Sequence, residues 1–390
     1  MDVISVTDRP ALLTLCARVE SAQRVALDTE FHGENSYIPR LMLLQLAFDD
    51  GVALVDPLAV PDLTPLARAL EGRQIIGHAL SADLRIFLER FDSLPPHVFD
   101  TQIAAAFCGF GASISLADAV RELVHVRLKK AHTVSDWSTR PLSPAQTEYL
   151  VDDVVHLIPL YERIRAMLIE RGRLEWAAAE CADMSNPSRY RVEGERLYLK
   201  VSGGQRLGRR ELAILSELAQ LRERIARERD TPLRFVASDD VLVAIASLRP
   251  KSVRDLDNLR RISEQTKRTL GTRLIEAVAA GEAWPEDRLP PKHSRGLDGG
   301  REALVTLMSV VAGAIAARED LPPSLLTPRS SLERVVRELP RDFAAFTATL
   351  GLSDWRVGLV GEPLWRLLSG ERKVTVSNYL DGDPHLAIDP

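Results

Sequence analysis

The sequence has few features of a membrane-bound or secreted protein. Only three of its 390 residues are cysteines, and Cys16, Cys108 and Cys181 lie far apart, in no spacing typical of metal ligands. We expect them to be reduced core residues of a cytoplasmic protein. No run of about 18 apolar residues predicts a membrane span. The N-terminal stretch MDVISVTDRP also lacks the basic and then apolar segments of a signal peptide.

The chain also lacks the strong positive charge of a simple nucleic-acid-binding protein, because its net charge is −5. The charge is unevenly distributed. Residues 1–170 carry 15 Lys and Arg against 23 Asp and Glu, whereas residues 171–390 carry 35 against 32. An acidic first part suits a site that collects cations, and a mildly basic remainder suits contacts with a polyanion.

The chain is long enough for two or three domains, with 45% hydrophobic and 27% charged residues. Strand-like runs at 25–31, 41–48, 52–57 and 74–79 alternate with helix-like stretches, which predicts an α/β domain with a mixed sheet. From about residue 101 the pattern is helical to the end. Linker-like stretches at 202–208 and 284–300 separate two similar helical segments, which indicates a divergent duplication.

Two acidic residues stand inside the apolar run RVALDTEF, at 24–31. Strand side chains two positions apart share one face, so Asp28 and Glu30 should project together. Like charges in a buried setting repel each other and lose hydration, so either a basic side chain or a metal ion must compensate them.

Three further polar residues are candidates for the same site. Asp83 lies where a helix should begin after a short strand, and it is either an ordinary first-turn acid or part of a ligand site. Tyr149 and Asp153 are four positions apart and share one face of a predicted helix. Spacing alone does not distinguish Asp153 from the adjacent Asp152.

Taken in order, these motifs resemble the DEDD exonuclease superfamily, in the subgroup with tyrosine four residues before the last aspartate. The stretches ALDTEF, YIPRLMLLQLA, LVDPL, GHALSADL, FDTQIAAAFCG and SDWSTRPLSPAQTEYLVDD, between residues 20 and 170, are similar to ribonuclease D. The two helical segments resemble HRDC domains, the second through GLSDWRVGLVGEPLWRLL.

The resemblance implies an α/β ribonuclease H-like exonuclease domain with a mixed sheet, followed by two all-α HRDC-like domains. We place the exonuclease domain at 1–172, a connecting segment at 173–204, the first HRDC domain at 205–286 and the second at 298–380.

The resemblance also implies the chemistry of the site. Asp28, Glu30, Asp83 and Asp153 would hold two divalent cations, Mg²⁺ or Mn²⁺, which prefer oxygen ligands. Tyr149 would orient the attacking water. The expected activity is a 3′–5′ exoribonuclease that releases nucleoside 5′-monophosphates. We expect a cytoplasmic, monomeric enzyme that trims tRNA precursors and other structured RNAs.

Other polar residues are candidates for a role in the site or for an ordinary structural role. Gln45 either contacts substrate or is buried and satisfied by backbone. His78 either contacts substrate or caps the next helix. Arg140 either holds a phosphate or is an ordinary surface residue. Asp100, at a strand end, is a candidate for supporting the metal ligands. Asp152 is expected to be a solvated or supporting acid.

Basic clusters at 189–210 and 249–273 could supply phosphate contacts or simply solubilise helix faces. Few aromatic residues lie among them, so base stacking is not expected as the main mode of binding. Two other functions are open from the residues alone. One is a DNA 3′–5′ exonuclease, since the carboxylate site reads phosphodiesters rather than sugars. The other is an inert RNA-binding protein, which the intact set of four acids and one tyrosine argues against.

Overall fold

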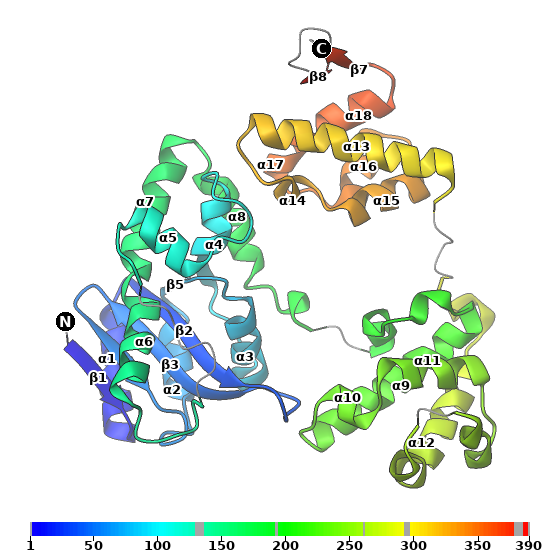
Figure 1. The fold of residues 1–390 in the computed structure, drawn as a ribbon, viewed down its shortest axis with the longest axis horizontal. Coiled ribbons are helices and arrows are strands. Elements are labelled where there is room, and N and C mark those ends of the chain that lie inside the picture. The colour runs from blue at the N-terminus through cyan, green and yellow to red at the C-terminus, as the bar shows by residue number, and fades with distance from the viewer. Residues whose placement is uncertain are drawn as a thin grey trace.

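The structure is a computed structural model that describes residues 2–128, 136–191, 194–259, 262–291, 297–377 and 385–388. An N-terminal α/β domain is followed by a first helical module and then a second (Figure 1). The expected fold class, an α/β domain with a mixed sheet followed by helical domains, is confirmed.

The sheet of the α/β domain has six strands in the order β1-β4-β3-β2-β5-β6. β3 is antiparallel to both of its neighbours, and the other pairs are parallel. The sequence did not predict β1, which is a short edge strand with only its last residue, Val6, buried. The strands are β1 (Asp2–Val6), β2 (Arg24–His32), β3 (Arg40–Phe48), β4 (Gly51–Val55), β5 (Gln74–Gly77) and β6 (His97–Asp100).

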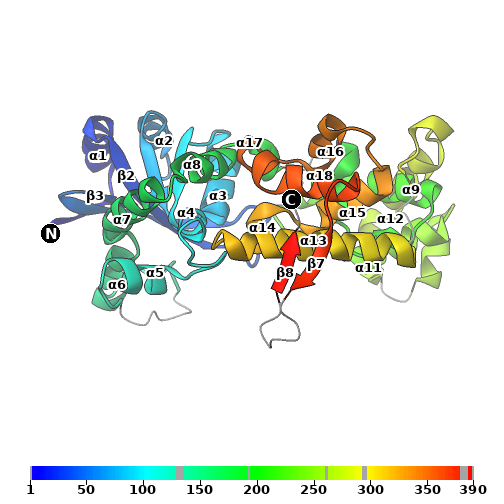
Figure 2. The same ribbon diagram turned by 90° about the horizontal axis from the view of Figure 1, so that it is seen from above.

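Helices cover both faces of this sheet (Figure 2). Apolar residues of α1, α2 and α3 pack on one face, and those of α6 and the start of α7 pack on the other. The start of α1 is capped by Asp8, whose carboxylate accepts a hydrogen bond from the Ala11 amide at 2.8 Å. The helices are α1 (Arg9–Ser21), α2 (Thr64–Leu70), α3 (Ser81–Phe91), α4 (Thr101–Ala106), α5 (Leu116–Leu123), α6 (Pro144–Val155), α7 (Leu157–Glu170) and α8 (Leu174–Asp183).

The segment 173–204, expected to be a connector, is packed at both ends. In its first half, α8 buries Ala177 and Cys181 against the α/β domain, and η1 (Pro187–Arg189) follows. In its second half, η2 (Gly194–Lys200) buries Leu197 in the core of the first helical module. The α/β domain therefore uses residues beyond position 172 for its own packing.

The two helical modules repeat the same elements at a constant offset of 90 residues. Helices of 20, 4 and 10 residues, α9 (Arg209–Glu228), α10 (Leu233–Val236) and α11 (Asp239–Leu248), recur as α13 (Gly299–Arg318), α14 (Pro323–Leu326) and α15 (Arg329–Glu338). Left-handed backbone recurs as well, at Asp230 and Asp320 and again at Arg249 and Leu339. This correspondence supports the predicted duplication.

The last part of the repeat has diverged. In the first module η3 (Gly204–Arg206) precedes the repeat, and η4 (Val253–Asn258), the continuous helix α12 (Glu264–Glu282) and η5 (Glu286–Arg288) complete it. In the second module the counterpart of α12 is broken by a π-helical turn. The elements of this part of the second module are α16 (Phe343–Leu350), α17 (Asp354–Arg356), η6 (Val357–Gly361) and α18 (Glu362–Leu368).

The second module shares a hydrophobic core with the α/β domain. The Trp355 ring stacks on Trp176 at 5.0 Å and meets Phe107 edge-on at 5.3 Å. Beside these rings, Arg356 forms a two-pronged ion pair with Glu180, including an Nη2–Oε2 distance of 2.8 Å. The first module, in contrast, meets the α/β domain through polar contacts with the loop after β2.

Two expectations about the C-terminal part need correction. By length and composition alone, α13 is long and apolar enough to cross a membrane. It was not expected to be, because its apolar residues do not form an uninterrupted run. Its residues Val305, Met308 and Ile315 nevertheless lie buried in the shared core, as in a core helix of a globular protein. The chain is also not helical to its end, because β7 (Val374–Ser377) and β8 (His385–Ile388) form an antiparallel hairpin.

Candidate active site

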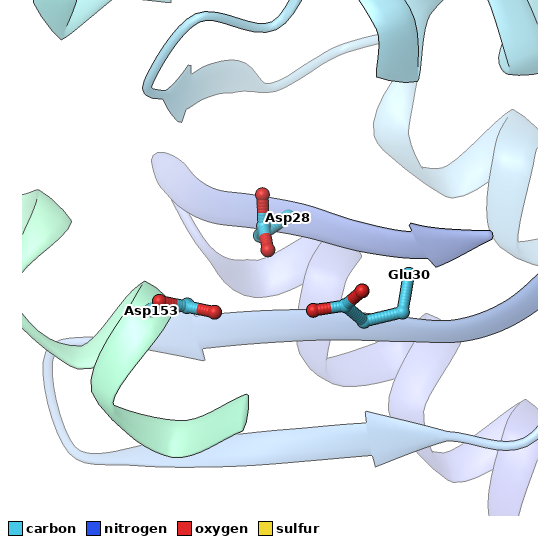
Figure 3. A group of neighbouring side chains, drawn as sticks. All are labelled: Asp28, Glu30 and Asp153. Atoms are coloured by element: carbon cyan, nitrogen blue, oxygen red, sulfur yellow. The ribbon is translucent and has the colours of Figure 1, made fainter. Parts of the chain in front are cut away.

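The site is built on β2, whose alternating side chains bring two carboxylates to one face of the sheet. Val25 and Leu27 point into the core under α1–α3, whereas Asp28 and Glu30 point toward α6. Both carboxylates are partly buried. The strand-face prediction from RVALDTEF is therefore confirmed (Figure 3).

α6 supplies the third carboxylate. Its start is fixed by a reciprocal capping box, in which the Gln146 amide donates to Ser143 Oγ at 3.2 Å and the Ser143 amide donates to the Gln146 side chain at 2.9 Å. With this register, one carboxylate oxygen from each of Asp28, Glu30 and Asp153 lies within 4.8 Å of the others. Asp153 faces the two strand carboxylates, and the adjacent Asp152 is not part of this group.

The fourth predicted acid, Asp83, lies behind this group rather than within it. It sits in the first turn of α3 and is only 6% exposed. Its carboxylate accepts a hydrogen bond from the Thr29 hydroxyl, on the strand residue between the two acids. Asp83 is close enough to Asp28 for its charge to raise the pKa of that carboxyl. The structure thus gathers all four acids, three of them converging and one adjacent.

Burial raises the pKa values of all four acids, and repulsion adds to it, from the other site acids for Asp28 and Glu30, from Asp100 for Asp83 and from Asp152 for Asp153. Desolvation is the largest cause in each case. It raises the pKa of Glu30 to about 7, with added repulsion from Asp153 and Asp83. The pKa values of Asp83 and Asp153 are raised to about 6, and that of Asp28 lies well above its usual range.

Among the residues that the structure describes, no basic side chain offsets this charge. Within the described parts of the chain, no Lys or Arg forms an ion pair with Asp28, Glu30 or Asp153. Clustered carboxylate oxygens without a cationic side chain are the ligand set that hard divalent cations prefer. Of the two ways to compensate the paired acids, the structure therefore favours a divalent metal ion.

Tyr149 bridges the carboxylates from α6. Its hydroxyl hydrogen-bonds to Asp153 and to Glu30, which offsets part of the rise that burial causes in the pKa of both carboxyls. Burial and the nearby negative charges raise the pKa of the phenol well above its usual range. Tyr149 therefore stays protonated at neutral pH and acts as a hydrogen-bond donor.

Trp137 is a site residue that the sequence analysis missed. Its ring stacks on Tyr149, with 5.6 Å between centroids and 29° between planes, and its side chain hydrogen-bonds to Glu30. It is 7% exposed. A tryptophan in the otherwise polar segment DWSTR is the signal that could have indicated a buried structural role.

Asp100 supports Asp83 through the backbone. Its carboxylate accepts hydrogen bonds from the amides of Ala79 (3.1 Å) and Leu80 (2.8 Å), and also from those of Gln102 and Ile103 at the start of α4. Ala79 has a positive φ of 58°, an uncommon backbone state for alanine that these bonds help to hold. Asp100 thus fixes the turn that leads into α3 and Asp83.

Gln45 is fully buried and pairs with Asp28 across β2 and β3. Neither its side-chain nitrogen nor its oxygen has a hydrogen-bond partner among the described residues, so the backbone-satisfied interpretation is wrong. A buried side-chain amide without a hydrogen-bond partner destabilises the fold, so a polar group that bonded to Gln45 would be stabilising.

His78 and Arg140 are held by the protein itself. The His78 ring nitrogens lie 2.9 Å from Thr101 Oγ1 and 2.9 Å from the Ile114 carbonyl, and α3 has no side-chain cap. Arg140 pairs with Asp56 and donates to the Met42 and Trp137 carbonyls at 3.0 and 2.8 Å. Arg140 is therefore not an ordinary surface arginine, and phosphate or substrate contact by either residue stays a prediction.

Comparison with known proteins shows which family the chain resembles along most of its length. The sequence family described as 3′-5′ exonuclease matches residues 3–169, and the HRDC domain family matches residues 211–278. The chain is 35% identical over 375 residues to ribonuclease D of Gluconacetobacter diazotrophicus, covering 95% of this chain and 93% of that protein. It is 33% identical over 372 residues to ribonuclease D of Escherichia coli, covering 94% of this chain and 99% of that protein.

A solved structure gives the same result. The crystal structure of Escherichia coli RNase D, an exoribonuclease involved in structured RNA processing, matches with a TM-score of 0.83 at 33% identity. The match covers 95% of this chain and 99% of that one. The resemblance found in the sequence motifs is confirmed, and the chain belongs to the ribonuclease D family.

Proposed function

We propose that this protein is a metal-dependent 3′–5′ exoribonuclease that removes nucleoside 5′-monophosphates from RNA 3′ ends. The observation that carries the proposal is the convergence of Asp28, Glu30 and Asp153 within 4.8 Å, with no cationic side chain paired to them in the described chain. Membership of the ribonuclease D family supports RNA as the substrate.

Two divalent cations, Mg²⁺ or Mn²⁺, fit this ligand set. Asp28, Glu30 and Asp153 offer converging oxygens, and Asp83 offers one more from the adjacent turn. Ions held by these residues would supply positive charge to the attacking and the leaving oxygen of a phosphoryl displacement. Binding of these cations would also offset the repulsion between the carboxylates, which otherwise keeps protons on these acids.

The chain's own residues position the water. Tyr149 remains protonated, so it donates a hydrogen bond and does not abstract a proton. Stacking on Trp137 restricts the phenol ring to one orientation. Glu30 and Asp153, which flank the hydroxyl, can accept the hydrogen bonds that the water donates.

We further propose that the enzyme is a cytoplasmic monomer that trims tRNA precursors and other structured RNAs. An Escherichia coli relative is an exoribonuclease involved in structured RNA processing, and this chain carries a match to the HRDC domain family beside its exonuclease domain. The three buried, unpaired cysteines suit a reducing compartment.

A degradation assay tests this function directly. Matched RNA and DNA oligonucleotides, labelled at the 5′ end, are incubated with the protein and Mn²⁺ or Mg²⁺. We expect RNA to shorten one nucleotide at a time from its 3′ end, faster than DNA, and to be stable when the ions are chelated. Internal cleavage, or faster loss of DNA, would contradict the proposal.

Substitutions on α6 separate a ligand from a water-orienting group. Asp153→Asn should abolish most activity and weaken Mn²⁺ binding, because a charged ligand is lost. Tyr149→Phe should lower kcat by about 10²–10³-fold, typical of losing one well-placed hydrogen-bond donor, and should retain most Mn²⁺ binding. Asp152→Asn, one position away with the same change in charge, is the matched control and should stay near wild type. A severe loss with Asp152→Asn and a mild one with Asp153→Asn would reverse the assignment.

The raised pKa values predict a particular pH dependence. The pKa of Glu30 is about 7 in the fold against 4.5 normally, and those of Asp83 and Asp153 are about 6 against 3.8. Between pH 4 and about 7 the folded, metal-free protein therefore binds more protons than the unfolded chain, and its free energy of unfolding should fall as pH rises.

Divalent ions should counteract this loss, because they bind the deprotonated carboxylates and release protons. Calorimetric titration with Mn²⁺ at about pH 6.5, in buffers of different ionisation enthalpy, measures the protons released. We expect clear release by the wild type and less by Asp153→Asn. Binding without proton release would mean that the ions bind elsewhere.

A further inference from the structure

A cleft of about 490 Å³ lies between the α/β domain and the first helical module, along the loop that follows β2. One wall of the cleft begins at Gly33, three residues after Glu30. At the rise per residue of a β-strand, Gly33 lies about 10 Å from Glu30 along the chain. The same wall includes Arg85 of α3, the helix that carries Asp83. The opposite wall is formed by α9, by the turn before α10 and by Lys200.

Polar contacts hold the two walls together. The Tyr37 amide donates to Asp230 Oδ1 at 3.0 Å, and the Tyr37 hydroxyl donates to Glu223. Arg234 donates to the Glu34 carbonyl at 3.0 Å. The cleft is therefore built from the loop that leaves the catalytic strand and from the module that docks on that loop.

The lining of the cleft is mainly cationic, in contrast with the acidic group on β2 and α6. It contains two carboxylates, Glu89 and Glu223, and five cationic side chains: Arg85, Arg191, Lys200, Arg227 and Arg234. Arg191 and Arg227 are paired with acids, but Arg85 and Lys200 form no ion pair with any described residue, and both are exposed. Unpaired cations in a cleft can contact phosphates without first breaking a salt bridge.

An aromatic ring lies next to Arg234, one of the residues that line the cleft. Phe235 of α10 is 59% exposed, the most exposed large apolar side chain in the described chain and the one aromatic ring in that group. The Arg234 guanidinium lies 4.8 Å from the centre of this ring and also bonds to the Glu34 carbonyl. The ring is thereby placed beside the loop 33–39 at the edge of the cleft.

The internal repeat shows that domain docking does not require this exposed ring. Both modules dock on the α/β domain through the same repeat position, Asp230 bonding to the Tyr37 amide and Asp320 to Arg171 at 2.9 Å. The counterpart of Phe235, ninety residues later, is Leu325, which packs against the shared core. Phe235 makes no such packing and is left free for another partner.

We propose that this cleft binds the single-stranded RNA segment just upstream of the 3′ end that is being hydrolysed. Arg85 and Lys200 contact its phosphates, and a nucleobase stacks on Phe235, over whose ring the Arg234 guanidinium lies. A positively charged groove with an aromatic platform is the arrangement typical of proteins that bind single strands with little sequence preference. The proposal rests on the proposed exoribonuclease function and deepens it by assigning where the strand enters.

A binding assay tests this site without hydrolysis. A twelve-nucleotide oligouridylate labelled with fluorescein at its 5′ end is titrated with the full-length protein in the presence of EDTA, and binding is measured by fluorescence anisotropy. Phe235→Ala should weaken binding about 5- to 150-fold, the range for loss of one stacked base. Phe235→Tyr should restore affinity, because any ring can stack. Ile169→Ala, which removes another large exposed side chain from α7 (52% exposed), is the control and should change nothing.

The phosphate contacts have a separate readout. The double variant Arg85→Ala, Lys200→Ala should flatten the slope of log affinity against log salt by about 0.7 for each lost contact. Arg68→Ala, an exposed cation on α2 outside the cleft, should leave the slope unchanged. An affinity that ignores Phe235→Ala, a failed rescue by tyrosine, or an unchanged slope would each overturn the cleft assignment. If RNA binds as expected and is not degraded when ions are added, the exonuclease function fails instead, and the two failures are distinguishable.

Discussion

Repulsion among carboxylates is the constraint on which the site depends. Asp28, Glu30 and Asp153 converge in a partly buried place, Asp83 adds its charge from behind, and the described chain pairs no Lys or Arg with the converging three. Without a bound cation, the fold can hold these acids together only by keeping protons on them, which the raised pKa values reflect. The arrangement costs stability and is explained only by a ligand that carries positive charge.

The surrounding structure holds that repulsive group in place. The capping box of Ser143 and Gln146 sets the register of α6, and the stacked Trp137 holds Tyr149 between Glu30 and Asp153. Arg140 anchors the segment before α6 to β3 through the Met42 carbonyl and to Asp56, and Asp100 anchors the turn before α3. Outside this shell, the two helical modules dock on the α/β domain in different ways, one through a shared apolar core and the other through polar contacts that leave a cationic cleft.

Local rules were enough to predict the parts of the site that depend on periodicity. Alternation along β2 placed Asp28 and Glu30 on one face, and helical spacing placed Tyr149 and Asp153 together, although only the family motif separated Asp153 from Asp152. The residues that were missed or misjudged depend on partners distant in sequence. Trp137 contacts Glu30 of β2, and Arg140 pairs with Asp56, 84 residues earlier. β1 was missed because it is a short edge strand with little burial to mark it, and the partnerless amide of Gln45 could only be seen in the packed fold.

The central claim, that the carboxylates of β2 and α6 form a divalent-cation site, is tested most directly by counting bound ions. Electron paramagnetic resonance of free Mn²⁺, titrated with the metal-free full-length protein, gives both the affinity and the number of ions bound. The account predicts two Mn²⁺ ions per chain, and loss of at least one of them in an Asp28→Asn, Asp153→Asn double variant. Equal binding by the wild type and the double variant would contradict it.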